Sequence, residues 1–322
     1  MNFKILIPML AIVLVAGCTI PDLGILGAGT SLVGGNGLSV TSFTAEPSPV
    51  YSGNTVRVTV EAQNLGGTTV GVGDSLLYLT GTDVNLADTS GSYWYGSATS
   101  DQTPIKHFNK NMTTANVVKG TSAVTDRVIW NLKAPTIPSG QTRQDTFILR
   151  VYSKYSSGVN GNIWIYSESE SEATKSAGRT LHTSSFTPIT GPIAVSVKLS
   201  PDPVVLYAGE STFSFDITLT NTATGSIYNK DINYASAGVG DLALDSETEL
   251  NHVTVTVDSG TLTLDTECVG DKQILGGKSL TLTCTATVPS ADTLTFQSFP
   301  MNVMVGYGYY TENEATVTIQ GK

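Results

Sequence analysis

Histidine and cysteine offer the most chemistry of any side chains in this sequence, and there are three of each. His107, His182 and His252 are widely spaced, and none belongs to the His-Glu-x-x-His pattern that binds zinc. The sequence also has no Gly-x-Ser-x-Gly nucleophile elbow, no phosphate-binding loop and no dinucleotide-binding glycine pattern. It therefore predicts a protein that is not an enzyme and holds no cofactor, with each histidine on the surface or in a loop.

Cys18 follows a stretch with the features of an export signal. Residues 1–4 carry one positive charge, residues 5–15 are apolar, and Ala16 and Gly17 are small. The apolar run is shorter than the roughly 20 residues that a membrane-spanning helix needs. This pattern predicts a signal peptide that is cleaved after export.

The same stretch resembles the lipobox of prokaryotic lipoproteins. The resemblance implies cleavage between Gly17 and Cys18 and a lipid on the Cys18 sulfur. The protein would then be anchored at the extracellular face of the cytoplasmic membrane, or at the outer membrane in a bacterium that has two membranes. The alternative is an ordinary secretory signal in which the cysteine occurs by chance.

If Cys18 carries a lipid, Cys268 and Cys284 remain as a pair. Export to an oxidising compartment favours a disulfide between them. A bridge around about 15 residues would stabilise the fold by roughly 3 kcal/mol, and it is expected to join neighbouring strands around the turn at Gly276-Gly277. Two buried free thiols are the alternative. A metal site is not predicted, because only His252 lies at moderate distance and no zinc ligand set results.

Two acidic clusters are candidate calcium sites, since calcium prefers several oxygen ligands from one turn. Neither has the calcium-hand spacing, so both are expected to be solvated loop carboxylates. Their members are Asp83, Asn85 and Asp88 in the first cluster, and Asp241, Asp245, Glu247 and Glu249 in the second.

Aromatic residues gather at Tyr93-Trp94-Tyr95, between serines and glycines. Such a cluster either forms a loop that binds a sugar or a protein partner, or forms a strand that places Trp94 in the hydrophobic core. Trp130 and Trp164 lie in alternating sequences and are expected in the core. Asn111 begins the one glycosylation sequon, which matters in an organism that glycosylates such sites, such as an archaeon.

Composition narrows the class of protein and its partners. The formal net charge is −10, and charged residues make up 14% of the 322 residues, against about 25% in an average protein. An acidic chain without basic clusters is a poor match to nucleic acid. The expected partners are the membrane, through the lipid on Cys18, and a protein or glycan at the cell surface.

Two parts of the chain follow one plan. Residues 46–64 and 201–221 share prolines, a Tyr-x-Gly, a long alternation of apolar and polar residues, and a final asparagine. Alternation of period two is typical of a half-buried strand. In each copy, Gly-Val-Gly-Asp follows the alternating segment, at 71–74 and at 238–241. Each copy is expected to end with an aromatic-rich strand, a polar turn and a last strand.

The proline-rich entry, Tyr-x-Gly and alternating strand resemble the immunoglobulin-like, CARDB-type repeats of archaeal and bacterial surface proteins. The resemblance implies an all-β fold with two tandem immunoglobulin-like β-sandwich domains. The expected division is a signal peptide (1–17), the lipidated cysteine with a Gly-rich linker (18–37), and sandwiches over 38–183 and 192–322.

These features predict a lipid-anchored cell-surface protein with a non-catalytic role in binding, adhesion or envelope structure. The alternative is a subunit of an extracellular filament or coat. In that case the apolar, Gly-rich segment 22–40 would add as a strand to an open sheet edge of a neighbouring copy. A solute receptor or an enzyme on a tether is a third class, for which the sequence shows neither an α/β body nor a catalytic constellation.

Overall fold

The structure, a computed structural model, describes residues 37–115 and 120–322. Strands account for 52% of it and helices for 10%, which confirms the predicted all-β class. The signal peptide, Cys18 and the linker up to residue 36 lie outside the described residues. Within the described part of the chain, no helix is long and apolar enough to cross a membrane.

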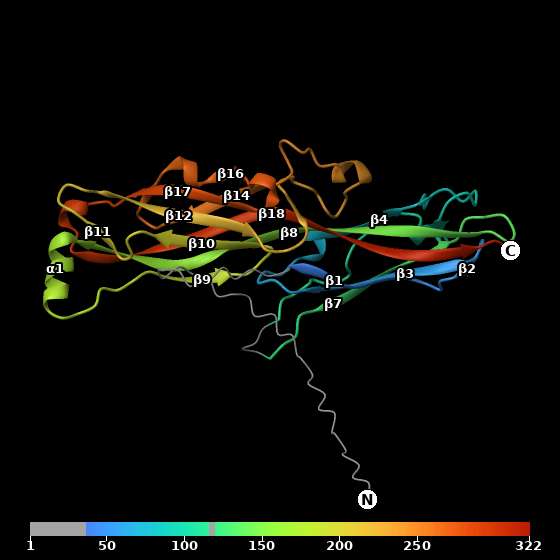
Figure 1. The fold of residues 1–322 in the computed structure, drawn as a ribbon, viewed down its shortest axis with the longest axis horizontal. Helices are drawn as coiled ribbons and strands as arrows, with labels where there is room; N and C mark the ends of the chain where they lie inside the picture. Colours follow the sequence, from blue (N-terminus) through green and yellow to red (C-terminus); the bar gives the residue numbers. More distant parts are fainter. Residues whose placement is uncertain (1–36, 116–119) are drawn as a thin grey trace, which may run out of the picture.

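Two very long strands lie side by side along the length of the molecule (Figure 1). They are β8 (Thr142–Ser167) and β18 (Phe296–Gln320). They pair antiparallel without interruption, from Phe296 opposite Tyr166 to Gln320 opposite Thr142. We call this pair the central ladder. The prediction that each copy ends with a strand, a turn and a last strand is therefore wrong, because each copy ends in one continuous strand.

The central ladder is the middle of a ten-stranded large sheet, whose main path runs β16-β14-β18-β8-β4-β6. Four short strands pair outside this path: β2 and β13 with β18, and β9 and β11 with β8. The bounds of the remaining strands in this sheet are β2 (Val50–Tyr51), β4 (Ser75–Gly81), β6 (Ile105–Lys106), β9 (Ser185–Ile189), β11 (Val204–Leu206), β13 (Ser226–Tyr228), β14 (His252–Asp258) and β16 (Gly270–Gln273).

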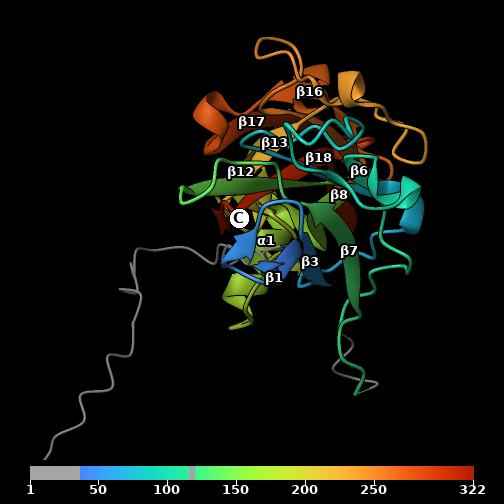
Figure 2. The same cartoon turned by 90° about the vertical axis from the view of Figure 1, so that its right-hand side faces the viewer.

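Two four-stranded sheets pack against the large sheet, one at each end of the central ladder. In Figure 2, which shows the end that carries the C-terminus, β1 and β3 lie below β8 and β18. The first small sheet has the order β1 (Leu38–Glu46), β3 (Thr55–Asn64), β7 (Thr125–Lys133) and β5 (Tyr95–Gly96). The second has the order β10 (Ile193–Leu199), β12 (Thr212–Asn221), β17 (Ser279–Thr287) and β15 (Thr263–Leu264).

Side-chain alternation along the central ladder explains how it packs against both small sheets. Every odd-numbered residue from Asp145 to Val159 is buried, and so is every odd-numbered residue from Phe299 to Tyr309. Because successive side chains point to opposite faces of a strand, one face of the ladder is buried along most of its length. Residues of both small sheets and of the ladder belong to one continuous hydrophobic core.

The two copies seen in the sequence share the pairings of their small sheets and a parallel pairing near the end of each long strand. β3 and β12 occupy the middle of the small sheets, in the alternating segments that predicted them. β2 pairs in parallel with the end of β18, and β11 pairs in parallel with the end of β8. Thus the last strand of each copy passes into the half of the molecule built by the other copy. The boundary expected at 183–192 contains β9, which pairs with β8 rather than forming a free linker.

The opposite face of the ladder is covered at its centre by a long connection between β13 and β14. A second hydrophobic cluster forms there. Its buried members are Leu76, Tyr152, Tyr228, Ile232, Tyr234 and Leu242.

One disulfide and one α-helix complete the fold. Cys268 and Cys284 are bonded, as predicted, with their Cα atoms 5.6 Å apart. The bridge joins β17 to a short helical turn that precedes β16, and not to a neighbouring strand as expected. Helix α1 (Glu168–Ser176) begins where β8 ends, because the Ser167 hydroxyl accepts a hydrogen bond from the Glu170 N–H. The short turns are η1 (Val72–Asp74), η2 (Thr99–Asp101), η3 (Val239–Leu242), η4 (Thr266–Cys268), η5 (Leu275–Gly277) and η6 (Ala291–Thr293).

The uninterrupted ladder makes a prediction about the two halves of the chain. A protease site inserted after Gly178, in an exposed turn, is expected to yield two fragments that still elute together on size exclusion. Each fragment keeps one long strand of the ladder, and the backbone pairing along it holds the pieces together. They should separate only in denaturant. Two cut fragments that separate in buffer as folded species would contradict the shared ladder, with the uncut insertion variant as the control.

Candidate functional site

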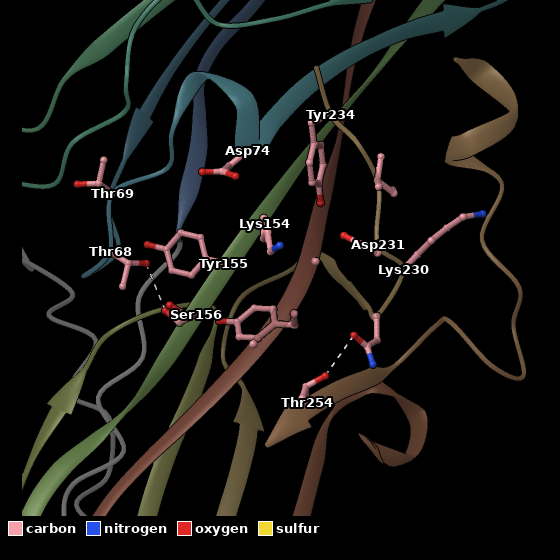
Figure 3. Close-up of a pocket in the computed structure, with 15 residues that line it drawn as sticks. Thr68, Thr69, Asp74, Lys154, Tyr155, Ser156, Lys230, Asp231, Tyr234 and Thr254 are labelled. Carbon is pink, nitrogen blue, oxygen red and sulfur yellow. Dashed lines mark hydrogen bonds between the residues drawn. The ribbon is translucent and has the colours of Figure 1, made fainter. Parts of the chain in front are cut away.

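A cavity of about 630 Å³ lies at the centre of the large sheet, on the face away from the small sheets. We call it the central cavity (Figure 3). Its floor is the middle of the central ladder, residues 154–156 of β8 and 306–308 of β18. Its walls come from the β3–β4 connection, through Thr68, Thr69 and Asp74, and from residues 229–234 after β13. Its size is in the range of small-molecule sites.

The cavity lies beside the part of β8 where one flanking strand, β4, ends and the next, β9, has not yet begun. β4 pairs with β8 as far as Ser153, and β9 begins to pair at Gly158. Between these points β8 has only β18 as a strand partner among the described residues. The hydroxyl of Thr68 donates a hydrogen bond to the carbonyl of Ser156 at 3.2 Å. Between β4 and β9, the Thr68 side chain therefore bonds to β8 where a strand would otherwise pair. The gap between these two strands leaves room for the cavity.

Two glycines of β18 shape the floor. A side chain at Gly306 would meet no atom within 4 Å of its Cβ, so this position opens into space. A Cβ at Gly308 would lie 2.1 Å from the ring of Tyr228, so this glycine allows the ring to pack flat on the sheet. Lys154 lies directly opposite Gly308 in the ladder. The absence of side chains at 306 and 308 therefore leaves Lys154 as the longest side chain on the floor.

Tyr234 lines one wall of the cavity, and its hydroxyl contacts that of Tyr228, which is fully buried. The hydroxyls of Tyr228 and Tyr234 lie 2.5 Å apart. Burial raises the pKa of Tyr228 well above its usual value. Burial also raises the pKa of Tyr234 to about 12, with the charges of Asp74 and Asp231 adding to the effect. Both hydroxyls therefore stay protonated at neutral pH, and Tyr234 can donate or accept a hydrogen bond but has no tendency to act as a base.

Three charged side chains line the cavity without forming ion pairs with one another. Among the described residues, Lys154, Asp74 and Asp231 take part in no ion pair within 4.0 Å. Lys230 differs, because its ammonium donates to the carbonyl of Ala243 at 2.8 Å and lies 3.5 Å from Glu249. In Figure 3 the Lys230 ammonium points away from the cavity. One ammonium and two carboxylates therefore remain free to contact a ligand.

The repeated Gly-Val-Gly-Asp motif positions one of these carboxylates. In both copies it forms a 3₁₀ turn, η1 and η3, closed by an aspartate N–H that donates to the first glycine carbonyl at 3.0 and 3.1 Å. The Asp241 carboxylate accepts a hydrogen bond from its own turn, from the N–H of Gly238. Asp74 makes no such bond and lines the cavity. The side chain of Asn111, the sequon residue, holds η1 by accepting from the N–H of Val72 at 3.0 Å.

The aromatic sequence 93–95 does not form a binding loop around Trp94. Trp94 is fully buried, and its indole N–H donates to the carboxylate of Asp145 at 2.8 Å. Its ring packs edge to face on Phe147. The core interpretation of Trp94 is therefore the one that the structure shows, while Tyr93 is exposed and Tyr95 is half-buried.

The other two tryptophans differ from each other. Trp130 is buried, as expected, and donates to the carbonyl of Thr103 at 3.1 Å. Trp164 was also expected in the core but is half-buried on the outer face. There its ring stacks on His182 and on Phe296, an exposed residue.

The acidic clusters are engaged with the protein itself. Asp83 pairs with Arg143 at 2.9 Å, and Asp88 accepts the N–H of Ser90. The N–H groups of Glu247 and Thr248 donate to Asp245 and lower its pKa. Within residues 37–115 and 120–322, no group of three or more acidic, histidine or cysteine side chains is placed to hold a metal ion.

The histidines have separate surroundings. His107 contacts the carbonyl of Ser75, and His252 contacts Asp271 at 2.8 Å. None of the three lines the central cavity. The residues that do line it come from five separate segments of ordinary polar composition, and only the motif at 71–74 stands out among them in the sequence. No family model matches this chain, and no curated protein matches it in sequence.

The position of Trp94 makes a prediction about stability. Trp94→Ala is expected to lower the free energy of unfolding by about 3–5 kcal/mol, because it removes a large buried side chain. It also removes the hydrogen bond to buried Asp145. Tyr93→Ala, at the exposed neighbour, should change stability by only about 0.5 kcal/mol. Denaturant unfolding of both variants measures this. A Trp94→Ala variant as stable as Tyr93→Ala would contradict a core role.

Proposed function

We propose that this chain is a lipid-anchored cell-surface protein that binds a hydroxyl-rich ligand, of the glycan class, in the central cavity. The observation that carries the proposal is a set of charges around the cavity, Lys154, Asp74 and Asp231, that form no ion pair with any residue the structure describes. The role is binding without catalysis. The lipid on Cys18 would hold the protein at the extracellular face of the cytoplasmic membrane, or at the outer membrane of a diderm bacterium.

The chemistry of the walls favours hydroxyl groups over a strongly charged ligand. Carboxylates accept two or more hydrogen bonds, an ammonium donates up to three, and a tyrosine hydroxyl does both. Sugar hydroxyls match such a mixture, because each one donates and accepts. The two carboxylates outnumber the one free ammonium, which disfavours anions such as phosphate.

The immunoglobulin-like architecture is part of the same proposal. Each half of the molecule would be one CARDB-type sandwich, in which a small sheet packs on half of the large sheet. The pairings of β2 with β18 and of β11 with β8 support an arrangement in which the two sandwiches exchange their last strands. A rigid body of this kind would present the cavity at a fixed position relative to the anchor.

The cavity is tested by substitution and saccharide binding. Screening the protein on an array of mono- and oligosaccharides, followed by titration calorimetry with the best binder, should give measurable affinity. Lys154→Ala should weaken binding roughly 10- to 100-fold, since a hydrogen bond to a charged group contributes about 1.5–3 kcal/mol. Gly306→Leu should also weaken binding by filling the floor, where no atom obstructs a side chain.

Lys198→Ala serves as the matched control for the cavity, because this exposed lysine lies on β10 away from the lining. Its affinity should equal that of the unchanged protein. Equal binding by all three variants would show that the saccharide binds elsewhere. The absence of binding to any saccharide would contradict the glycan assignment.

The anchor is tested at Cys18. The mature protein should begin at this cysteine and partition with membranes, and intact mass should show the added acyl chains. Cys18→Ser should leave the precursor uncut or release the protein, because the acylated sulfur is lost. A mature N-terminus at another residue, without lipid, would contradict the lipoprotein assignment and leave the cavity proposal standing.

A further inference from the structure

A lysine, an aspartate and an asparagine meet beside β7 of the first small sheet. The Lys106 ammonium donates a hydrogen bond to Oδ1 of Asp101 at 2.7 Å, and the Asn131 amide donates to Oδ2 of the same carboxylate at 3.2 Å. Lys106 lies in β6, Asp101 ends η2, and Asn131 lies in β7. One carboxylate therefore holds an amine and a carboxamide near each other. We call these three residues the β7 cluster.

The β7 cluster is largely shielded from solvent. The Asp101 side chain is 5% exposed, and that of Lys106 is 18% exposed. The Lys106 ammonium also donates to the carbonyl of Ile129 at 2.6 Å and lies 5.2 Å from the centre of the Trp130 ring. Because both contacts are to residues of β7, the amine is held against the strand that carries Asn131.

The other half of the molecule has a covalent link at the corresponding place. There η4 follows the short strand β15, and Cys268 at the end of η4 is bonded to Cys284 of β17. In the first half η2 follows the short strand β5, and Asp101 at the end of η2 contacts β7. β7 and β17 are the third strands of the two small sheets, and β5 and β15 are the fourth. Each half thus fastens a helical turn to the same strand of its small sheet.

Two backbone hydrogen bonds match these places residue by residue. The N–H of Ser97, just after β5, donates to the carbonyl of Asn131 at 2.9 Å. The N–H of Asp265, just after β15, donates to the carbonyl of Thr285 at 3.0 Å. Asn131 therefore corresponds to Thr285, the neighbour of the disulfide residue Cys284. The β7 cluster lies where the second half is cross-linked.

We propose that Lys106 and Asn131 become joined by an isopeptide bond, with Asp101 as the acid and base of the reaction. Asp101 first takes a proton from the ammonium through Oδ1. The neutral amine then attacks Cγ of Asn131, which forms the new C–N bond and a tetrahedral carbon. Asp101 moves one proton from the attacking nitrogen to the leaving nitrogen, which faces Oδ2, and the old C–N bond breaks. The products are the amide, one molecule of ammonia and a protonated Asp101.

The β7 cluster supplies what this reaction requires. A carboxamide reacts slowly with an amine in water, so the two groups must be held together and protons must be transferred as the bonds change. Asp101 does both, because its two oxygens contact the two reacting side chains. The product also replaces a partly buried ion pair by neutral groups, which removes the cost of keeping two charges out of water. No oxidant or other co-reactant is needed.

Peptide mapping of the full chain, reduced, unfolded and digested with trypsin, tests the bond. In the unchanged protein, residues 128–133 should be joined through Asn131 to a peptide that runs past uncleaved Lys106, with one ammonia less than the sum of the two sequences. Lys106→Arg should release 128–133 as a free peptide, because a guanidinium stays charged and cannot attack. Lys110→Arg is the matched control at an exposed lysine, and it should keep the linked peptide.

A free 128–133 peptide in the digest of the unchanged protein would overturn the proposal and leave the β7 cluster as a hydrogen-bonded ion pair only. Asp101→Asn tests the acid and base, since an asparagine has a similar size but accepts no proton from the ammonium. It should give the free peptide while its circular dichroism matches that of the unchanged protein. A linked peptide in this variant would overturn the role of Asp101.

Discussion

The backbone pairing of β8 with β18 is the constraint on which the rest of the structure depends. It joins the last strand of one copy to the last strand of the other along the whole of both strands. Each small sheet then packs on residues from both strands, so neither half can bury its core without the other copy. Backbone hydrogen bonds fix the register, and a slip by one residue would turn every buried side chain to the opposite face.

Duplication explains the framework, and local differences between the copies explain the cavity. The turns η1 and η3 are closed in the same way, yet only η1 brings a free carboxylate to the centre of the sheet. In η3 the aspartate is used within its own turn. The connection after β13 covers the outer face and brings Tyr234 and Asp231, whereas the connection after β3 is shorter. The cavity is therefore an asymmetric feature on a symmetric framework.

The sequence predicted the parts of the fold whose signal is local. The alternation in residues 55–64 and 212–221 located β3 and β12. With Cys18 assigned to the lipid, the export context paired Cys268 with Cys284. The segment 156–162 was expected to turn, because serine, glycine and asparagine favour turns. Pairing with β18 on one side outweighs that preference along the whole segment, and β9 adds a partner on the other side from 158 onward. Helix α1 was missed, since its nine residues depend on the Ser167 cap more than on an apolar face.

The cavity could not be found from the sequence, because its lining is set by where neighbouring strands begin and end. β4 stops pairing with β8 at Ser153 and β9 starts at Gly158, while on β18 the partner changes between Gly306 and Gly308. The gaps in both flanks coincide at the middle of the ladder. The floor is nevertheless held in place, because β8 and β18 stay paired with each other there. Groups mounted on such a floor keep their positions without a ligand, and a rigid site loses less entropy on binding than a mobile loop does.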